Sequence, residues 1–204
     1  MDNRFYRQAK FLISAAAPKQ FPQDDGLEVA FAGRSNAGKS SAINALCDHQ
    51  GLAKTSKTPG RTRLVNFFAL DDRRRLVDLP GYGYAKVPEA VKLEWQALLE
   101  EYLTQQECLR GLVVIVDIRH PLKEFDWQML DWCKHFGLPA HVLLTKADKL
   151  KRGAQAKSLL QVKKELKQAG VDASVQAFSA SSLQGMDQLV AKLDSWLELP
   201  PQAD

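Results

Sequence analysis

The chain lacks a long apolar run, has few cysteines, and shows no regular spacing of its histidines. A membrane-spanning helix needs about 20 consecutive apolar residues, and no segment approaches that length. The cysteines are Cys47, Cys108 and Cys133, an odd number at wide spacing without a C-x-x-C pair. They predict small buried thiols in a reducing compartment and argue against a disulfide or metal framework.

The N-terminus has only part of the shape of a secretion signal. Arg4, Arg7 and Lys10 precede the apolar stretch Phe11–Ala17, which Pro18 ends. Because seven apolar residues are the lower limit for a signal core, we interpret this segment otherwise and predict a cytoplasmic protein.

The length and the pattern of the chain predict one α/β domain. With 204 residues there is room for one full core, and apolar strand-like runs alternate with helical patterns. We expect a three-layer P-loop fold: a mostly parallel sheet, helices on both faces, and one antiparallel edge strand in a hairpin around residues 71–73. Residues 1–24 are predicted to be an extension, 25–199 the domain and 200–204 a short tail. A helical stripe predicted to pack into the core consists of Phe125, Met129, Trp132, Cys133 and Phe136.

The most informative feature is the phosphate-binding loop Gly33–Ser40, which follows the apolar run 28–32. Glycines let backbone N–H groups converge on phosphate oxygens, and the following helix adds its positive dipole end. Lys39 supplies a charge for the terminal phosphates, and the Ser40 hydroxyl can bind magnesium. The alternative, a glycine-rich turn without a ligand, does not explain the strand and helix around the loop. The motif predicts a nucleotide-binding protein.

A second motif, Asp78-Leu79-Pro80-Gly81, follows another apolar strand. An aspartate at a strand end can orient magnesium through water, and the Gly81 amide can sense a γ-phosphate. Four such residues in isolation would indicate a β-turn. Their position behind the phosphate loop favours the nucleotide-related role.

The third motif, Thr145-Lys146-Ala147-Asp148, follows the strand 142–144 and predicts guanine specificity. Guanine presents two donors, N1–H and the exocyclic amine, that fit the Asp148 carboxylate, whereas adenine presents an acceptor at N1. The stem of Lys146 can lie along the base. After the last predicted strand, Ser179-Ala180-Ser181 offers a backbone N–H for guanine O6.

Magnesium also needs a second hydroxyl ligand. The basic loop 51–63 offers Thr55, Ser56, Thr58 and Thr62, and Thr62 lies just before the next strand, where a loop could close over a γ-phosphate. The alternative role for Thr62 is that of a surface threonine in a turn.

In this order the motifs resemble those of the translation-factor-related P-loop GTPases. The strings GRSNAGKSSAINAL, TSKTPGRTRLVNFF, DLPGYGYAKV and TKADKL resemble more narrowly the EngB (YihA) family of bacterial GTPases, over residues 26–199. That resemblance implies a GTPase with a role in large-ribosomal-subunit assembly and an association with cell division and septation. It implies magnesium ligation by Ser40 and Thr62, and catalytic contributions from Lys39, Thr62, Gly81 and Asn36. The implied nucleotide contacts are Gly33, Arg34, Ser35, Asn36, Ala37, Gly38, Lys39, Ser40, Gly60, Arg61, Thr62, Arg63, Leu64, Asp78, Leu79, Pro80, Gly81, Thr145, Lys146, Ala147, Asp148, Phe178, Ser179 and Ala180.

The sequence departs from the wider GTPase pattern at two positions. Thr145 replaces a frequent asparagine, which weakens one bracing hydrogen bond, and Tyr82 stands where Ras-like proteins carry a water-orienting glutamine. No arginine finger can be assigned, so we expect slow intrinsic hydrolysis, on the order of 10⁻⁴ to 10⁻² s⁻¹. Related GTPases with asparagine at the position of Asn36 can use K⁺ to offset charge. The alternative is that Asn36 only braces the loop.

Two classes of function remain, and the charge distribution bears on the choice. Segment 146–168 carries eight Lys or Arg against two acids, and segment 51–75 carries seven against two. This concentration favours ribosomal RNA and the large ribosomal subunit or its precursor as partners of a GTP-driven assembly factor. The alternatives are a signalling or division switch with a protein effector, and a basic face that is merely solvated. An ATP-using kinase fits poorly with Asp148. We expect a monomer without a membrane or DNA partner.

Overall fold

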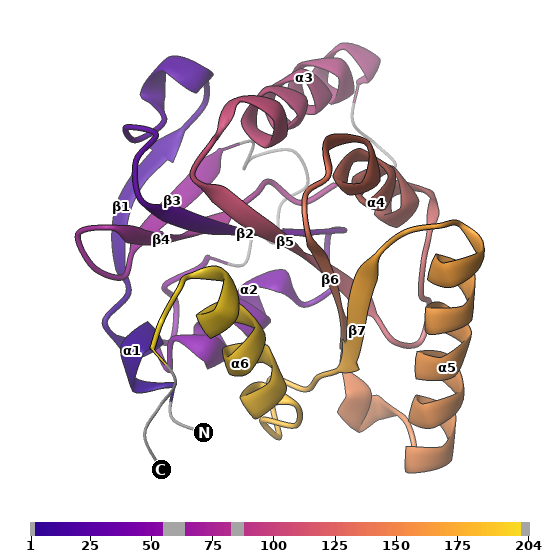
Figure 1. The fold of residues 1–204 in the computed structure, drawn as a ribbon. Helices are drawn as coiled ribbons and strands as arrows, with labels where there is room; N and C mark the ends of the chain where they lie inside the picture. The colour runs from indigo at the N-terminus through magenta and orange to yellow at the C-terminus, as the bar shows by residue number, and fades with distance from the viewer. Residues whose placement is uncertain (1–2, 55–63, 83–87, 201–204) are drawn as a thin grey trace.

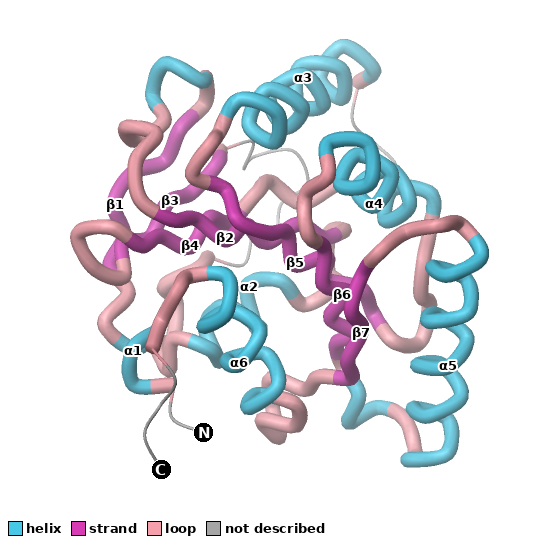
Figure 2. Tube along the Cα trace, viewed as in Figure 1, coloured by secondary structure: helices cyan, strands magenta, loops and turns pink. Residues whose placement is uncertain are grey.

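A computed structural model describes residues 3–54, 64–82 and 88–200, apart from the side chains of 91 and 92. Within these residues, seven strands form one sheet that is flanked by six α-helices (Figures 1 and 2). The strands are β1 (Lys10–Ala15), β2 (Leu27–Gly33), β3 (Val65–Ala69), β4 (Arg74–Asp78), β5 (Leu109–Asp117), β6 (Ala140–Thr145) and β7 (Ala173–Ala177). The helices are α1 (Arg4–Arg7), α2 (Lys39–Leu46), α3 (Glu89–Gln105), α4 (Glu124–Phe136), α5 (Arg152–Gln168) and α6 (Met186–Trp196), with short 3₁₀ turns η1 (Pro18–Gln20) and η2 (Ala147–Lys149).

The centre of the sheet is parallel and buried on both faces. The strand order is β1-β3-β4-β2-β5-β6-β7, and β4, β2, β5, β6 and β7 run in one direction. Every residue of β2 and of β6 is buried, as a parallel sheet covered on two sides requires. This arrangement confirms the predicted P-loop α/β fold with helices on both faces.

Two clusters of buried side chains lie on opposite faces of the sheet. Helices α3, α4 and α5 contribute Leu99, Met129 and Val162 to one cluster, and α1, α2 and α6 contribute residues such as Ile43 and Leu193 to the other. Figure 1 shows the same division of the helices between the two faces. The three layers therefore enclose two cores, and α2, which starts at the phosphate loop, belongs to the second.

The edge of the sheet differs in one detail from the prediction. Strand β3 is the reversed strand and pairs with β4 through the predicted hairpin, but β1 pairs antiparallel with its other side. The reversed strand is therefore internal, and β1 forms the edge. Residues 10–15, which fall within the predicted extension 1–24, form this edge strand, and Phe11, Leu12 and Ile13 are exposed on it. Tyr6 is fully buried, and its hydroxyl donates to Asp194 of α6 at 2.7 Å.

The predicted aromatic stripe on α4 packs into the core only in part. Met129 and Cys133 are buried, and Phe125 and Trp132 pack against the core from partly buried positions. Phe136 is 40% exposed and does not belong to the core, because the helix ends there and Gly137 turns the chain with φ = 65°. In the described part of the chain, no helix has both the length and the apolar character needed to cross a bilayer.

Candidate nucleotide-binding site

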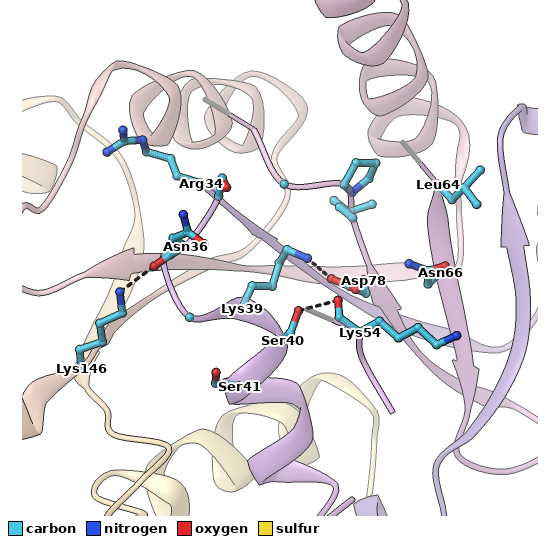
Figure 3. Close-up of a pocket in the computed structure, with 15 residues that line it drawn as sticks. Arg34, Asn36, Lys39, Ser40, Ser41, Lys54, Leu64, Asn66, Asp78 and Lys146 are labelled. Carbon is cyan, nitrogen blue, oxygen red and sulfur yellow. Dashed lines mark hydrogen bonds and ion pairs between the residues drawn. The ribbon is translucent and has the colours of Figure 1, made fainter. Parts of the chain in front are cut away.

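A cavity of about 340 Å³ opens where β2, β4 and the start of α2 meet, at the carboxyl ends of the parallel strands. This is the edge of an open α/β sheet at which ligands ordinarily bind. Figure 3 shows its lining, which consists of predicted contact residues together with Ser41, Lys54 and Asn66. The lining residues are Arg34, Ser35, Asn36, Gly38, Lys39, Ser40, Ser41, Lys54, Leu64, Asn66, Asp78, Leu79, Pro80, Gly81 and Lys146.

The phosphate loop runs from the end of β2 to the first residue of α2. Gly38, directly before the helix, has φ = 100°, and Asn36 has φ = 62°. A Cβ on Gly33 would lie 2.8 Å from the Cβ of Ile115, so only glycine fits where the loop leaves the sheet. The loop therefore brings backbone N–H groups and the N-terminus of α2 to the cavity, as a polyphosphate site requires.

Lys39 and Asp78 form an ion pair across the floor of the cavity, and their side chains are only 11% and 7% exposed (Figure 3). The Ser40 hydroxyl donates to the backbone oxygen of Lys54 at 3.3 Å. Lys39 and Asp78 thus neutralise each other, and the Ser40 hydroxyl has a backbone partner. A phosphate could attract Lys39 away from Asp78, which frees the carboxylate to face a cation and its waters.

Tyr82 points away from the cavity. Its backbone forms a parallel bridge with Arg34, and its hydroxyl donates to Asp126 of α4 at 3.0 Å. The ring is 2% exposed and contacts Trp95 and Phe125, and burial together with Asp126 raises the pKa of the hydroxyl well above its usual range. The residue after Gly81 therefore cannot present a water-orienting side chain to the cavity.

The loop after β6 is tied to the phosphate loop. The Thr145 hydroxyl lies 2.5 Å from the backbone oxygen of Ala37 and 3.1 Å from that of Val116. Thr145 thus braces the phosphate loop against the end of β5 through its hydroxyl. Lys146 has φ = 59°, and its ammonium donates to the backbone oxygen of Asn36 at 2.6 Å.

Asp117, at the end of β5, holds Lys146 from the other side. Its carboxylate lies 2.9 Å from the Lys146 ammonium and accepts two hydrogen bonds from the Arg119 guanidinium. Burial would raise the pKa of Asp117, but the bonds from Arg119 and Lys146 outweigh it and hold the pKa well below the usual range. The carboxylate therefore stays charged and fixes the lysine that is predicted to lie along a base.

The predicted base-recognition residues lie beside this loop, although the cavity lining reaches only Lys146 among them. Asp148 accepts a hydrogen bond from the Ser179 hydroxyl at 2.7 Å and pairs with Lys149 at 2.9 Å, which lowers the pKa of Asp148 to about 2. Ala147 and Phe178 are fully buried and joined by a backbone hydrogen bond of 3.0 Å. The Ser179 N–H already donates to Gln184, which leaves the Ala180 N–H as the candidate donor to a base.

Four predicted contact residues, Gly60, Arg61, Thr62 and Arg63, lie outside the described residues. Sequence reasoning missed Asn66 and Asp117. A signal existed for each: Asn66 is a polar residue inside the apolar strand 65–69, and Asp117 ends the apolar run of β5. Asn66 falls within the string TSKTPGRTRLVNFF and Asp117 falls in none of the quoted strings, but for both residues only strand pairing reveals what the side chain faces.

The comparisons with known proteins identify the class. Residues 28–146 match the family model described as 50S ribosome-binding GTPase. The chain belongs to this family of P-loop GTPases, and it binds and hydrolyses guanine nucleotide accordingly.

Among solved structures, the chain is similar to a probable GTP-binding protein EngB, with 20% identity, a TM-score of 0.68, and coverage of 85% of this chain and 100% of that one. It is also similar to Era in complex with MgGDPNP and a fragment of 16S ribosomal RNA (19% identity, TM-score 0.63, 88% and 58% covered). A third likeness is to the bacterial selenocysteine-specific elongation factor EF-Sec (20% identity, TM-score 0.62, 85% and 29% covered). At 19–20% identity, these similarities establish that the chain shares the fold of these proteins.

Proposed function

We propose that this GTPase is a guanine-nucleotide switch in assembly of the large ribosomal subunit, and that cell division and septation depend on it. The family description and the likeness to Era, a protein solved with ribosomal RNA, support the proposal. The observation that carries it is the exposed basic face of α5.

Helix α5 exposes cations along most of its length. Residues Lys151, Arg152, Lys157, Lys163, Lys164 and Lys167 are exposed. Leu160, between them, is 72% exposed, so none of the described residues covers this face. A row of cations along one helix fits a phosphate backbone, and the sole acid near the C-terminal half, Glu165, already accepts from Gln161 at 2.9 Å.

Magnesium is the proposed cofactor, with Ser40 and Thr62 as its ligands. Ser40 and Asp78 line the same cavity, and oxygen donors of this kind fit Mg²⁺. When bound, the ion offsets charge on the β- and γ-phosphates. Lys39 would turn from Asp78 to the terminal phosphates, and the Gly81 N–H would donate a hydrogen bond to the γ-phosphate. Thr62 lies outside the described residues.

Guanine recognition is proposed for the far end of the site. The Asp148 carboxylate would accept N1–H and the exocyclic amine, while Ser179 keeps it oriented by the 2.7 Å hydrogen bond. Lys146 would lie along the base, anchored by Asp117. Because Tyr82 is buried, no group from its position orients water, which accounts for the slow intrinsic hydrolysis that we expect.

Co-sedimentation with large-subunit particles tests the proposal, with GTP analogue, GDP or no nucleotide bound. We expect binding that depends on nucleotide and falls steeply with salt. The variant K163E/K164E should lose binding and reduce the slope of log affinity against log salt by roughly 2 if each lysine meets one phosphate. The matched control, K10E/K19E, changes the same charge at exposed residues near the opposite edge of the sheet. Equal binding with GDP and the analogue, or equally tight binding of random RNA, would contradict the proposal.

One observation favours the alternative, a switch with a protein effector. A groove of about 760 Å³ lies between α3 and α4, and its described lining combines carboxylates with aromatic side chains: Glu89, Gln96, Glu124, Phe125, Trp127, Gln128, Asp131 and Trp132. Carboxylates disfavour RNA there. If E124K/D131K abolishes sedimentation with particles while K163E/K164E does not, the protein-effector function is the better one.

A further inference from the structure

Three polar residues from strands far apart in the sequence form one row across the sheet. Ser14 of β1 is the register partner of Asn66 of β3, and Asn66 is the register partner of Asp78 of β4. Directly paired residues of antiparallel strands project to the same face of the sheet. Ser14, Asn66 and Asp78 therefore project to the face of the sheet that α2 covers, and Lys39 of α2 reaches Asp78 there. The row therefore leads from the N-terminal edge strand to the cavity.

The hydrogen bond between the first two residues fixes the orientation of the Asn66 amide. The Ser14 hydroxyl donates to Oδ1 of Asn66 at 2.5 Å, and an amide oxygen is the only acceptor on that side chain. The amide nitrogen must then face the other way. Figure 3 shows it on the side of Asp78, where Asn66 lines the cavity. A side chain held in this manner offers N–H donors to the cavity.

The ion pair of Asp78 explains why such a donor matters. Lys39 neutralises the Asp78 carboxylate in the structure. Once Lys39 turns to phosphates, that carboxylate needs another group to keep it directed at the cation and its waters. Tyr82 cannot serve, because its hydroxyl is bonded to Asp126.

We propose that Asn66 is a positioning residue, fixed by Ser14 of the N-terminal strand, whose amide N–H holds the Asp78 carboxylate toward the water shell of the bound Mg²⁺. The proposal rests on the magnesium and nucleotide site argued above. It makes β1 a functional part of that site.

Release of a fluorescent GDP and a fluorescent non-hydrolysable GTP analogue, measured against Mg²⁺ concentration, tests the proposal without relying on turnover. Partners that orient a metal's ligands typically change metal affinity by about 10- to 100-fold. We therefore expect N66A to raise the Mg²⁺ concentration for half-maximal retention about 10-fold, while nucleotide affinity in excess chelator stays unchanged. S14A should shift it in the same direction by less, and S14T, which keeps a hydroxyl, should restore the wild-type value.

Two controls separate this inference from its basis. K10A alters the same strand outside the row and should leave the Mg²⁺ dependence unchanged. S40A removes a proposed ligand and should abolish the dependence. If the wild type itself shows no Mg²⁺-dependent retention, the proposed site is wrong. If the wild type and S40A behave as expected but N66A and S14A both match the wild type, only the role of Asn66 is overturned. S14A reports on the row even if N66A fails to fold.

Discussion

The two ends of the sheet each carry a buried ion pair, and the pairs differ in how completely they are satisfied. At the amino ends of the strands, Arg75 bonds to Glu28 at 2.7 Å, and Tyr102 donates to the other Glu28 oxygen at 2.8 Å. The same guanidinium also contacts Asp25 and the backbone oxygen of Gln23. At the carboxyl ends, Lys39 and Asp78 pair beside an open cavity.

This difference indicates that the first ion pair stabilises the fold, whereas the second is placed to bind a ligand. The Glu28 side chain is 1% exposed, and each of the three guanidinium nitrogens of Arg75 donates a hydrogen bond. A ligand therefore has no access by which it could replace either partner of this ion pair. The Lys39 ammonium can exchange Asp78 for a phosphate, because the cavity adjoins it. We therefore expect changes at the closed end to alter stability, and changes at the open end to alter ligand binding.

The largest expected effect lies at the open end. Asp148→Asn should reduce GTP and GDP affinity by roughly 10⁴-fold, because an amide cannot accept two donors from guanine. It should improve binding of xanthine nucleotides, whose changed edge can pair with an amide. Competition against a fluorescent guanine nucleotide measures both, and the midpoint of unfolding should hardly move. Equal competition by ATP and GTP in the wild type would contradict guanine specificity.

At the closed end, Arg75→Ala should lower the free energy of unfolding by about 3–5 kcal/mol, because it leaves the Glu28 carboxylate buried without its cation. Arg73→Ala, which removes the same charge from an exposed neighbour, should cost less than about 0.5 kcal/mol. Urea denaturation measures the two variants. If GDP affinity fell in the Arg75 variant while stability did not, the separation between the two ends would be wrong.

A third effect comes from His141, near the closed end of β6. Its ring nitrogens lie 2.8 Å from Ser174 Oγ and 3.0 Å from Gln176 Oε1, and burial lowers the pKa to about 4 despite the contact with Gln176. The unfolded chain takes up a proton below pH 6.5, whereas the folded chain does so only below about 4. The contribution of His141 to the free energy of unfolding is therefore fully present above pH 6.5. It should fall by about 3 kcal/mol as the pH drops to 4.

Comparison of variants isolates this histidine. His141→Gln should lose that part of the pH slope, and the exposed His135→Gln should retain it. Asp148, with a pKa of about 2, stays ionised throughout this range, so the carboxylate proposed to bind guanine does not contribute to this slope. An unchanged slope in the His141 variant would assign the effect to other groups.

The sequence predicts the fold, and it points to the loops that line the cavity, for a physical reason. Residues 33–40, 78–81 and 145–148 act through contiguous backbone and side-chain groups, so their spacing alone reveals the geometry. The buried strands are equally visible, because parallel strands covered on both faces are continuously apolar. Ser14, Asn66 and Asp117 could not be found in this manner: strand pairing brings Ser14 and Asn66 together across 52 positions. The position of β1 outside β3 escaped prediction for the same reason.

The smallest expected effect is the dependence of the hydrolysis rate on K⁺ at the open end of the sheet. Asn36 lines the cavity at φ = 62°, and its backbone oxygen accepts from Lys146 at 2.6 Å, so only its side-chain oxygen is considered as a ligand for a cation. A cation there would offset charge that develops in transfer, which matters because Tyr82 is buried and contributes nothing. Turnover should be severalfold faster in K⁺ than in Na⁺ at equal ionic strength, and Asn36→Ala should remove the difference while GDP affinity persists. If both salts give the same rate, Asn36 only braces the loop, and the charge compensation at the open end comes from Lys39 and Mg²⁺ alone.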